Sequence, residues 1–183
     1  MPHSSPAMEQ FLASVERRAF RMAQIATGNT EDALDIVQDA MFGLVKHYAH
    51  KSPPEWKPLF YRILVSRIRD WFRRQKIRGR WRTWLRSGRR QDESVYEDPL
   101  EMVPDTAGRN PADQTLIGDS LTALEFALRK LPLRQQQAFL LRAWEELSVG
   151  ETAAVMKCST GSVKTHYSRA IHRLREALED HWS

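Results

Sequence analysis

The sequence predicts an all-α protein made of two small helical bundles that are joined by a flexible acidic linker. Through most of the chain, apolar residues recur at intervals of three and four, the period of an amphipathic helix. No segment shows the sustained two-residue alternation of a half-buried strand. A polar stretch containing glycines and prolines separates the two periodic parts. We therefore expect bundles at residues 8–86 and 115–181 and the linker at 87–114.

The composition is that of an ordinary globular protein. Of the 183 residues, 42% are hydrophobic and 28% are charged, which excludes the fibrous and wholly disordered classes. No window approaches the roughly 18 apolar residues of a membrane span, and the N-terminus lacks the pattern of a secretory signal. The single cysteine, Cys158, cannot form an internal disulfide, which fits a reducing compartment. We expect a cytoplasmic protein without direct membrane insertion.

Charge is distributed unevenly along the chain. Residues 51–90 hold 14 Lys and Arg against 2 Asp and Glu, whereas residues 91–125 hold 1 against 9. Lys and Arg that neutralise phosphates release counterions and add affinity that does not depend on sequence. The basic segment therefore suggests binding to a polyanion, although a solvated basic face would have the same composition.

Three helices are expected in the first bundle. Their spans are residues 8–26, 30–48 and 58–76, and the pattern of the third allows an extension to 85. Thr30, followed by two acids, is a favourable N-cap, and Ser52-Pro53-Pro54 predicts a break. The second helix is expected to bury Leu34, Val37, Met41, Leu44 and Tyr48.

The second bundle is expected to contain a helix-turn-helix. Its predicted helices are residues 116–131, 134–144, 149–156 and 160–178. Ser148 and Ser159 are placed to cap the last two, and small residues such as Ala153 allow close helix packing. Because the linker between the two bundles is predicted to be flexible, we expect the bundles to have no fixed separation.

The last helix has one apolar and one polar face. At about 100° per residue, Val163, Tyr167 and Ala170 fall on the apolar side. The opposite, basic side suits a DNA major groove, where hydroxyl and guanidinium groups reach base edges. The alternative is a helical hairpin with a hydrated basic surface. The candidate DNA-contacting residues are Ser162, Lys164, Thr165, Ser168, Arg169 and His172.

The third helix also carries a basic stripe. Arg62, Arg69, Arg73 and Lys76 fall within about 60° of one another, with Ser66 beside them. Such a stripe can follow a phosphate backbone, and nearby aromatic rings can stack on unpaired bases. Tyr61 and Phe72 could be stacking platforms, but each is also placed to join the core.

The residues of both bundles resemble those of bacterial RNA polymerase sigma factors. Residues 147–170 are similar to that family's promoter-reading helix-turn-helix, and residues 130–142 to the helix that precedes it. Residues 31–45 are similar to the polymerase-docking helix, and residues 56–76 to the promoter-melting helix. Lys157 stands where the family often has glycine, at a position that can require positive φ. The family's usual asparagine in the melting helix is Ser66 here.

The resemblance implies specific roles and partners. It implies that residues 8–86 are sigma region 2, which binds core RNA polymerase and the −10 promoter element, and that residues 115–181 are region 4, which reads the −35 element. The implied polymerase-docking stripe is Asp35, Gln38, Asp39 and Phe42. The implied contacts to melted DNA are Lys51, Trp56, Tyr61, Arg62, Ser66, Arg69, Arg73 and Lys76. The short chain fits the extracytoplasmic-function (ECF) group, in which an anti-sigma factor is a common partner.

Two other classes of protein fit the sequence less well. An enzyme is disfavoured because the sequence has no Gly-rich phosphate loop, no metal-spaced Cys or His set and no nucleophile-base arrangement. We therefore expect no cofactor, metal or small-molecule substrate. A stand-alone helix-turn-helix regulator that binds an operator is the alternative. It would explain the C-terminal bundle and leave the acidic stripe and the basic third helix without a role.

Overall fold

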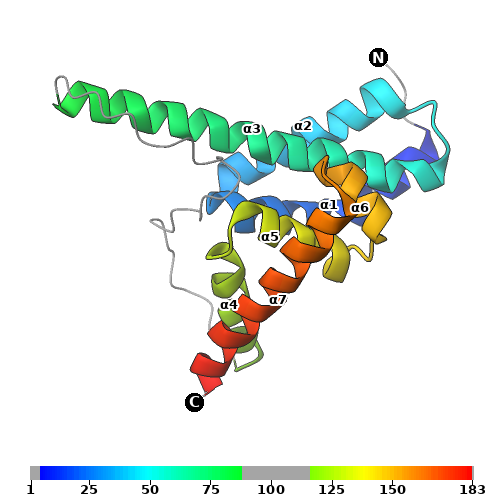
Figure 1. Cartoon of the computed structure of the whole chain (residues 1–183). Coiled ribbons are helices and arrows are strands. Elements are labelled where there is room, and N and C mark those ends of the chain that lie inside the picture. Colours follow the sequence, from blue (N-terminus) through cyan, green and yellow to red (C-terminus); the bar gives the residue numbers. More distant parts are fainter. Residues whose placement is uncertain (1–4, 88–115, 183) are drawn as a thin grey trace.

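A computed structural model describes residues 5–87 and 116–182 of the chain (Figure 1). These residues form helices and short connections, and no strand occurs in this part of the chain. The predicted all-α class is therefore confirmed. The linker predicted at 87–114 lies outside the described residues, except for Ser87, which ends a helix.

Helix α1 (Pro6–Thr27) has clear signals at both ends. The Ser5 side chain accepts a hydrogen bond from the Met8 amide at 3.2 Å, and proline in the first turn has no amide hydrogen that would need a partner. At the other end Gly28 has φ of 68°, a left-handed conformation that glycine adopts without Cβ strain. Its amide donates to the Gln24 carbonyl at 2.8 Å, which closes the helix.

Helix α2 (Thr30–Tyr48) begins at a cap other than the predicted one. The N-cap is Asn29, whose side chain accepts a hydrogen bond from the Asp32 amide at 3.0 Å, and Thr30 is already helical. The buried face also differs, because Leu34 is 47% exposed. The buried residues are Ala33, Ile36, Val37, Ala40, Gly43 and Leu44, with Met41 and Tyr48 partly buried. Small residues in this set let α2 lie close to its neighbours.

Helix α3 (Pro53–Ser87) starts earlier and ends later than the span 58–76. The amide and hydroxyl of Ser52 both donate to the Glu55 carboxylate, at 3.0 and 2.7 Å, and this cap starts the helix. The Ser-Pro-Pro sequence thus follows the end of α2 and begins α3, because proline is well tolerated in a first turn. Pro58 lies within the helix. In Figure 1 the far end of α3 projects beyond the bundle.

The second bundle has the predicted order of elements. Its helices are α4 (Leu116–Arg129), α5 (Leu133–Phe139), the π-helical turn η1 (Leu140–Trp144), α6 (Val149–Met156) and α7 (Thr160–Trp182). The predicted helix 134–144 is therefore an α-helix that widens into a π-helical turn. Ser148 caps α6 in a reciprocal capping box with Glu151, and Ser159 accepts a hydrogen bond from the Ser162 amide at 3.0 Å. Both predicted serine caps are confirmed.

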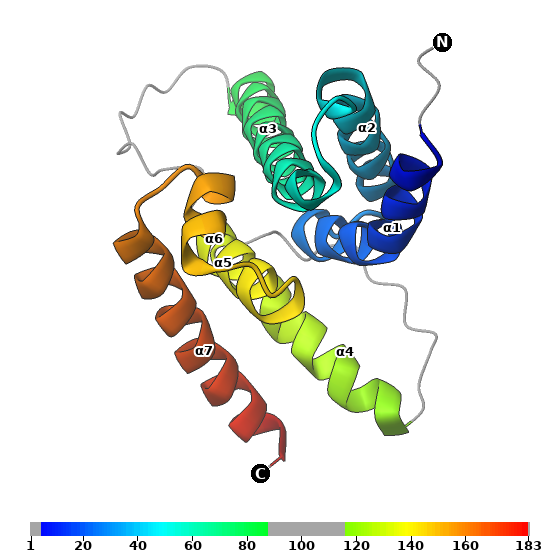
Figure 2. The same cartoon turned by 90° about the vertical axis from the view of Figure 1, so that its right-hand side faces the viewer.

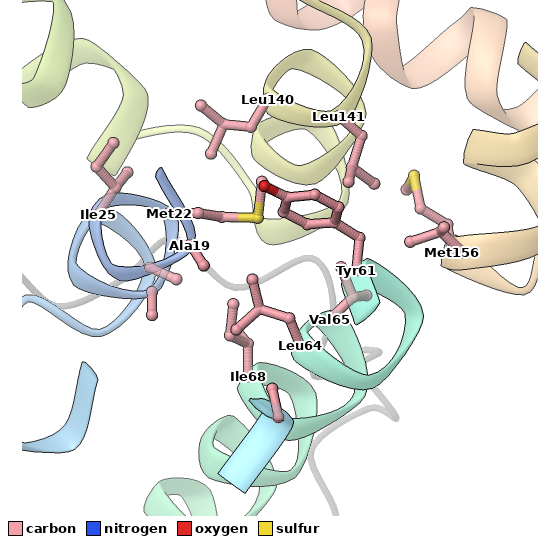
Figure 3. Packing of buried hydrophobic residues seen from close by; sticks show 14 of the residues in the cluster. Ala19, Met22, Ile25, Tyr61, Leu64, Val65, Ile68, Leu140, Leu141 and Met156 are labelled. Carbon is pink, nitrogen blue, oxygen red and sulfur yellow. The ribbon is translucent and has the colours of Figure 1, made fainter. Parts of the chain in front are cut away.

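The two bundles pack against each other, contrary to the expectation that they have no fixed separation. Helix α6 lies on α3, and α4 meets α1 (Figure 2). Apolar residues form one continuous buried cluster across the junction. In Figure 3 the Tyr61 ring of α3 lies among Met22, Leu140, Leu141 and Met156. The periodicity of each bundle could not reveal this contact, because it is made by residues that flank each bundle's own core face.

Lys157, at the end of α6, is a strained position whose replacement should stabilise the protein. It has φ of 53° and ψ of 50°, a left-handed conformation that costs a residue with a Cβ about 1 kcal/mol. Lys157→Gly should raise the free energy of unfolding by about 0.5–1 kcal/mol, measured by urea denaturation with circular dichroism. Lys164→Gly, in the interior of α7, should lower it by about 1 kcal/mol. Destabilisation by both variants would contradict a strained turn.

Candidate nucleic-acid interface

The turn between α6 and α7 sets the direction of the exposed helix α7. Lys157 reverses the chain in the left-handed conformation, and the Cys158 amide donates to the Ala153 carbonyl at 3.1 Å. Ser159 then caps α7. Cys158 itself is half-buried, and burial raises the pKa of its thiol. The two helices therefore form the predicted helix-turn-helix.

Packing of one face fixes the rotation of α7. Val163, Ala170 and Leu174 are buried, and the Tyr167 ring stacks on Phe139 of α5 with centroids 6.3 Å apart. Val163, Tyr167 and Ala170 form the predicted apolar side. With that side held against α5, the opposite side of α7 faces solvent.

The predicted DNA-contacting side of α7 is solvent-facing. Lys164, Thr165, Ser168, Arg169 and His172 are exposed, and Ser162 is half-buried. Some polar groups already have partners within the helix. The Thr165 hydroxyl donates to the Gly161 carbonyl at 3.1 Å, the Ser162 and Ser159 hydroxyls lie 2.9 Å apart, and His172 Nε2 lies 3.4 Å from the Glu176 carboxylate. The structure thus brings all six residues to one face, and the cation on it with the greatest reach is Arg169.

The basic stripe of α3 also lies on an outer face. Arg62 and Arg73 are exposed, and Ser66, Arg69 and Lys76 are half-buried. Arg73 Nη1 is 3.8 Å from the Asp70 carboxylate, one turn away. Near the start of α3, Lys51 is exposed and pairs with Glu55 at 3.6 Å. A continuous helix keeps these cations aligned along about four turns.

Two aromatic residues predicted to contact melted DNA are buried instead. Trp56 is 4% exposed and packs against Phe11 with ring centroids 5.9 Å apart. Tyr61 is 0% exposed, lies beneath the second bundle (Figure 3), and cannot stack on a base in this arrangement. Phe72, the other possible platform, is buried as well. Aromatic side chains on a short bundle are drawn into the core because each buries a large apolar area.

The acidic stripe of α2 is exposed and borders a groove. Asp35, Gln38 and Asp39 are exposed, and Phe42 is 66% exposed beyond them. The opposite wall of the groove comes from α3 and carries Arg74 and Arg78. The other lining residues are Asp32, Ile36, Trp71 and Gln75.

The two arginines of this groove were not identified from the sequence. They lie on the same side of α3 as Phe60 and Leu64, beyond the point where the core ends. The sequence signal for them is a cation at a helical position where the spacing of the buried face would call for an apolar residue. Elsewhere in the described residues, no group of three His, Cys, Asp or Glu side chains could hold a metal ion. No helix of the described chain is long and apolar enough to span a membrane.

Comparison with known proteins identifies the family. The Sigma-70 region 2 model matches residues 7–78, and the model of Sigma-70, region 4 matches residues 121–174. RNA polymerase sigma factor SigV of Bacillus subtilis is 30% identical over 160 residues, which are 87% of this chain and 83% of that protein. The chain belongs to the sigma-70 family of RNA polymerase sigma factors, in the ECF group.

Other sigma factors align with nearly the whole chain. The RNA polymerase sigma-E factor of Streptomyces coelicolor is 28% identical, over 93% of this chain and 85% of that protein. The ECF RNA polymerase sigma factor SigM of Mycobacterium tuberculosis is 27% identical, over 94% and 77%. Sigma factor RpoE of Bartonella quintana, solved in complex with the anti-sigma factor NepR, has the same fold, with a TM-score of 0.59, 24% identity and coverage of 93% and 96%.

The geometry of α7 predicts different effects for two of its cations. Arg169→Ala should cost about 1–3 kcal/mol on a duplex that the protein has selected from random sequence, because an exposed guanidinium can donate two hydrogen bonds to a base edge. Lys164→Ala should weaken binding to all duplexes and lower the salt slope by about one unit. Fluorescence anisotropy at several salt concentrations measures both, with Arg17→Ala on α1 as the control. Equal losses on selected and random duplexes for both variants would contradict base reading by α7.

Proposed function

We propose that this protein is an alternative sigma factor that binds core RNA polymerase and directs initiation at specific promoters. The observation that carries the proposal is that a single chain presents an exposed acidic face on α2, a basic stripe on α3 and a polar, basic face on α7. The family matches fall on the two bundles that carry these faces. An operator-binding regulator would leave the first two faces without a role.

The second bundle is proposed to be sigma region 4, over residues 115–181. In this role α7 enters the major groove of the upstream promoter element, and Arg169 and Ser168 contact base edges. Lys164, on the flank of the exposed face, contacts phosphates. Backbone contacts position such a helix, whereas base contacts give it specificity. The exposed, small side chains Thr165 and Ser168 support close approach to DNA.

The first bundle is proposed to be sigma region 2, over residues 8–86, with residues 87–114 as the linker. Its basic stripe, chiefly Arg62 and Arg73, follows the phosphates of the melted promoter element. Lys51 extends the cationic path toward the start of α3. Contacts between these cations and phosphates do not depend on the DNA sequence, so any base preference in this region has to come from other contacts.

Core polymerase is proposed to dock on the acidic stripe of α2. An exposed aromatic flanked by carboxylates is a typical centre for a protein interface, because the ring supplies apolar area and the charges direct the approach. Phe42 is this ring, and Asp35 and Asp39 are the flanking acids. The groove behind them offers Arg74 and Arg78 to acidic groups of the partner.

The remaining proposals concern location and partners. A protein that works on polymerase and promoter DNA acts in the cytoplasm, and its single cysteine is compatible with a reducing compartment. It acts by binding and not as an enzyme. An anti-sigma factor is a proposed partner, as RpoE of Bartonella quintana has one in its solved complex.

Transcription with core enzyme tests the proposed function directly. Purified protein added to core polymerase should produce discrete run-off transcripts from genomic fragments and should co-elute with the polymerase on a sizing column. Asp39→Arg combined with Phe42→Ala should weaken the complex at least tenfold, because it reverses a charge and removes the exposed ring. Glu16→Arg, an exposed acid on α1, is the matched control. Unchanged affinity with unchanged helicity would contradict docking on this stripe.

A further inference from the structure

A buried carboxylate of the second bundle is paired with cations of the first. Glu145, which follows the η1 turn, is only 1% exposed. Its carboxylate lies 3.4 Å from Arg18 Nε on α1 and 3.6 Å from Lys57 Nζ on α3. Lys57 Nζ also donates to the Glu145 backbone carbonyl at 2.6 Å. These contacts join positions more than 80 residues apart, across the junction of the bundles.

The Glu145 ion pairs lie to one side of the apolar contact made by Tyr61. The Tyr61 ring lies beside Leu141 and Met156 of the second bundle (Figure 3). Burial, together with the negative charge of Glu145, raises the pKa of the Tyr61 hydroxyl. The junction is thus an aromatic ring covered by aliphatic side chains, with a paired charge at its edge.

The bundles are joined by the Glu145 contacts and by an ion pair between Arg21 of α1 and Glu125 of α4. The Glu145 contacts are the ones suited to opening. The Arg18 and Lys57 nitrogens lie 3.4 and 3.6 Å from the Glu145 carboxylate, and neither of these two contacts has the geometry of a normal hydrogen bond. A buried charge whose hydrogen bonds are incomplete retains much of its desolvation cost. Arg18 and Lys57 keep 51% and 35% of their side-chain surface exposed, so water can replace Glu145 as their partner. The pairing therefore selects one arrangement of the bundles without making it permanent.

The closed arrangement places Tyr61 beneath the second bundle, whereas Lys51, Arg62 and Arg73 of the first bundle stay exposed. The outer face of α7 and the acidic stripe of α2 remain exposed. Tyr61, by contrast, is completely covered and directly precedes Arg62 of the basic stripe. Separation of the bundles would place an aromatic ring beside a phosphate-binding cation, the combination that single-stranded nucleic acid binds.

We propose that Glu145, Arg18 and Lys57 form an interbundle latch, and that its opening uncovers Tyr61 as a stacking platform for a base of the melted promoter strand. This inference rests on the proposed function for its DNA ligand. The latch itself is a property of the isolated chain. Tyr61 then has two environments: an apolar one in the closed protein, and one in contact with DNA in the open protein.

Energy transfer between dyes on the two bundles tests the latch. The dyes are attached at Ala13→Cys and Ala177→Cys, both exposed alanines, in a Cys158→Ser background. Glu145→Lys places a third cation at the site and should raise the open-to-closed ratio at least tenfold, because like charges in a buried site repel. Glu146→Lys makes the same charge change at the exposed neighbouring residue and should leave transfer unchanged.

A charge exchange distinguishes the latch from general damage to the second bundle. Lys57→Glu lies in the first bundle and should also open the protein, whereas Lys57→Glu combined with Glu145→Lys should recover much of the lost transfer. Circular dichroism and thermal unfolding verify that each variant is folded. If the folded Glu145→Lys and Lys57→Glu variants keep the transfer efficiency of the parent, the latch is refuted.

Binding of single-stranded DNA tests the role of Tyr61. The probe is a fluorescein-labelled 12-nucleotide strand of mixed sequence. The Glu145→Lys variant should bind it about tenfold more tightly than Glu146→Lys does, although both carry the same net charge. Adding Tyr61→Leu to Glu145→Lys should remove most of this gain, whereas adding Tyr61→Phe should preserve it, because stacking requires the ring and not the hydroxyl. Equal affinity of the two lysine variants, or an unchanged gain with Tyr61→Leu, would overturn the platform.

These measurements use no polymerase, so they separate this inference from the proposed function. Absence of run-off transcripts together with opening in Glu145→Lys would leave the latch standing and refute the sigma activity. Run-off transcription together with unchanged energy transfer in both charge-reversal variants would support the sigma activity and refute the latch.

Discussion

Burial of one face of α3 is the constraint on which the other surfaces of the molecule depend. Phe60, Leu64 and Ile68 lie in the core of the first bundle with no exposed area, and their burial fixes the rotation of the helix. The cations of the stripe then lie on the outer side, with Arg62 and Arg73 exposed, because they are across the helix from the buried side chains. Tyr61, at the border of the two faces, meets the second bundle (Figure 3). The packing of one helix face therefore sets both a charged surface and an interbundle contact.

In the second bundle, too, burial of one helix face determines which side chains are exposed, and here caps and a turn also define where the helices begin and end. Two serine caps and a left-handed turn at Lys157 determine where α6 ends and α7 begins. The stacking of Tyr167 on Phe139 then determines which side of α7 is covered. The polar side is left exposed at the surface. A helix with small exposed side chains and a long cation such as Arg169 can approach a base edge closely while keeping its packing intact.

The junction between the bundles combines an apolar contact, which is strongly favourable, with ion pairs of Glu145, which contribute less. Aliphatic and aromatic side chains bury apolar area, which favours the closed arrangement. Glu145 adds a buried charge that is only partly compensated by Arg18 and Lys57. A junction of this kind favours one arrangement and still allows another, because loss of the apolar contact is offset in part by hydration of three charged groups. The two surfaces proposed to bind DNA, on α3 and α7, need such freedom if each is to meet its own promoter element.

The sequence by itself determined the helical class, the order of the elements, the two serine caps of the helix-turn-helix and the outward face of α7, because these follow from local spacing and capping. It could not decide which borderline residues are covered. Asn29 replaced Thr30 as a cap, Leu34 was left exposed, and Trp56 and Tyr61 were buried. Each burial depends on which neighbour lies opposite, and a side chain at the edge of an apolar stripe is buried only when a second element reaches it. For Tyr61 that element is the second bundle, and only the tertiary structure brings it there.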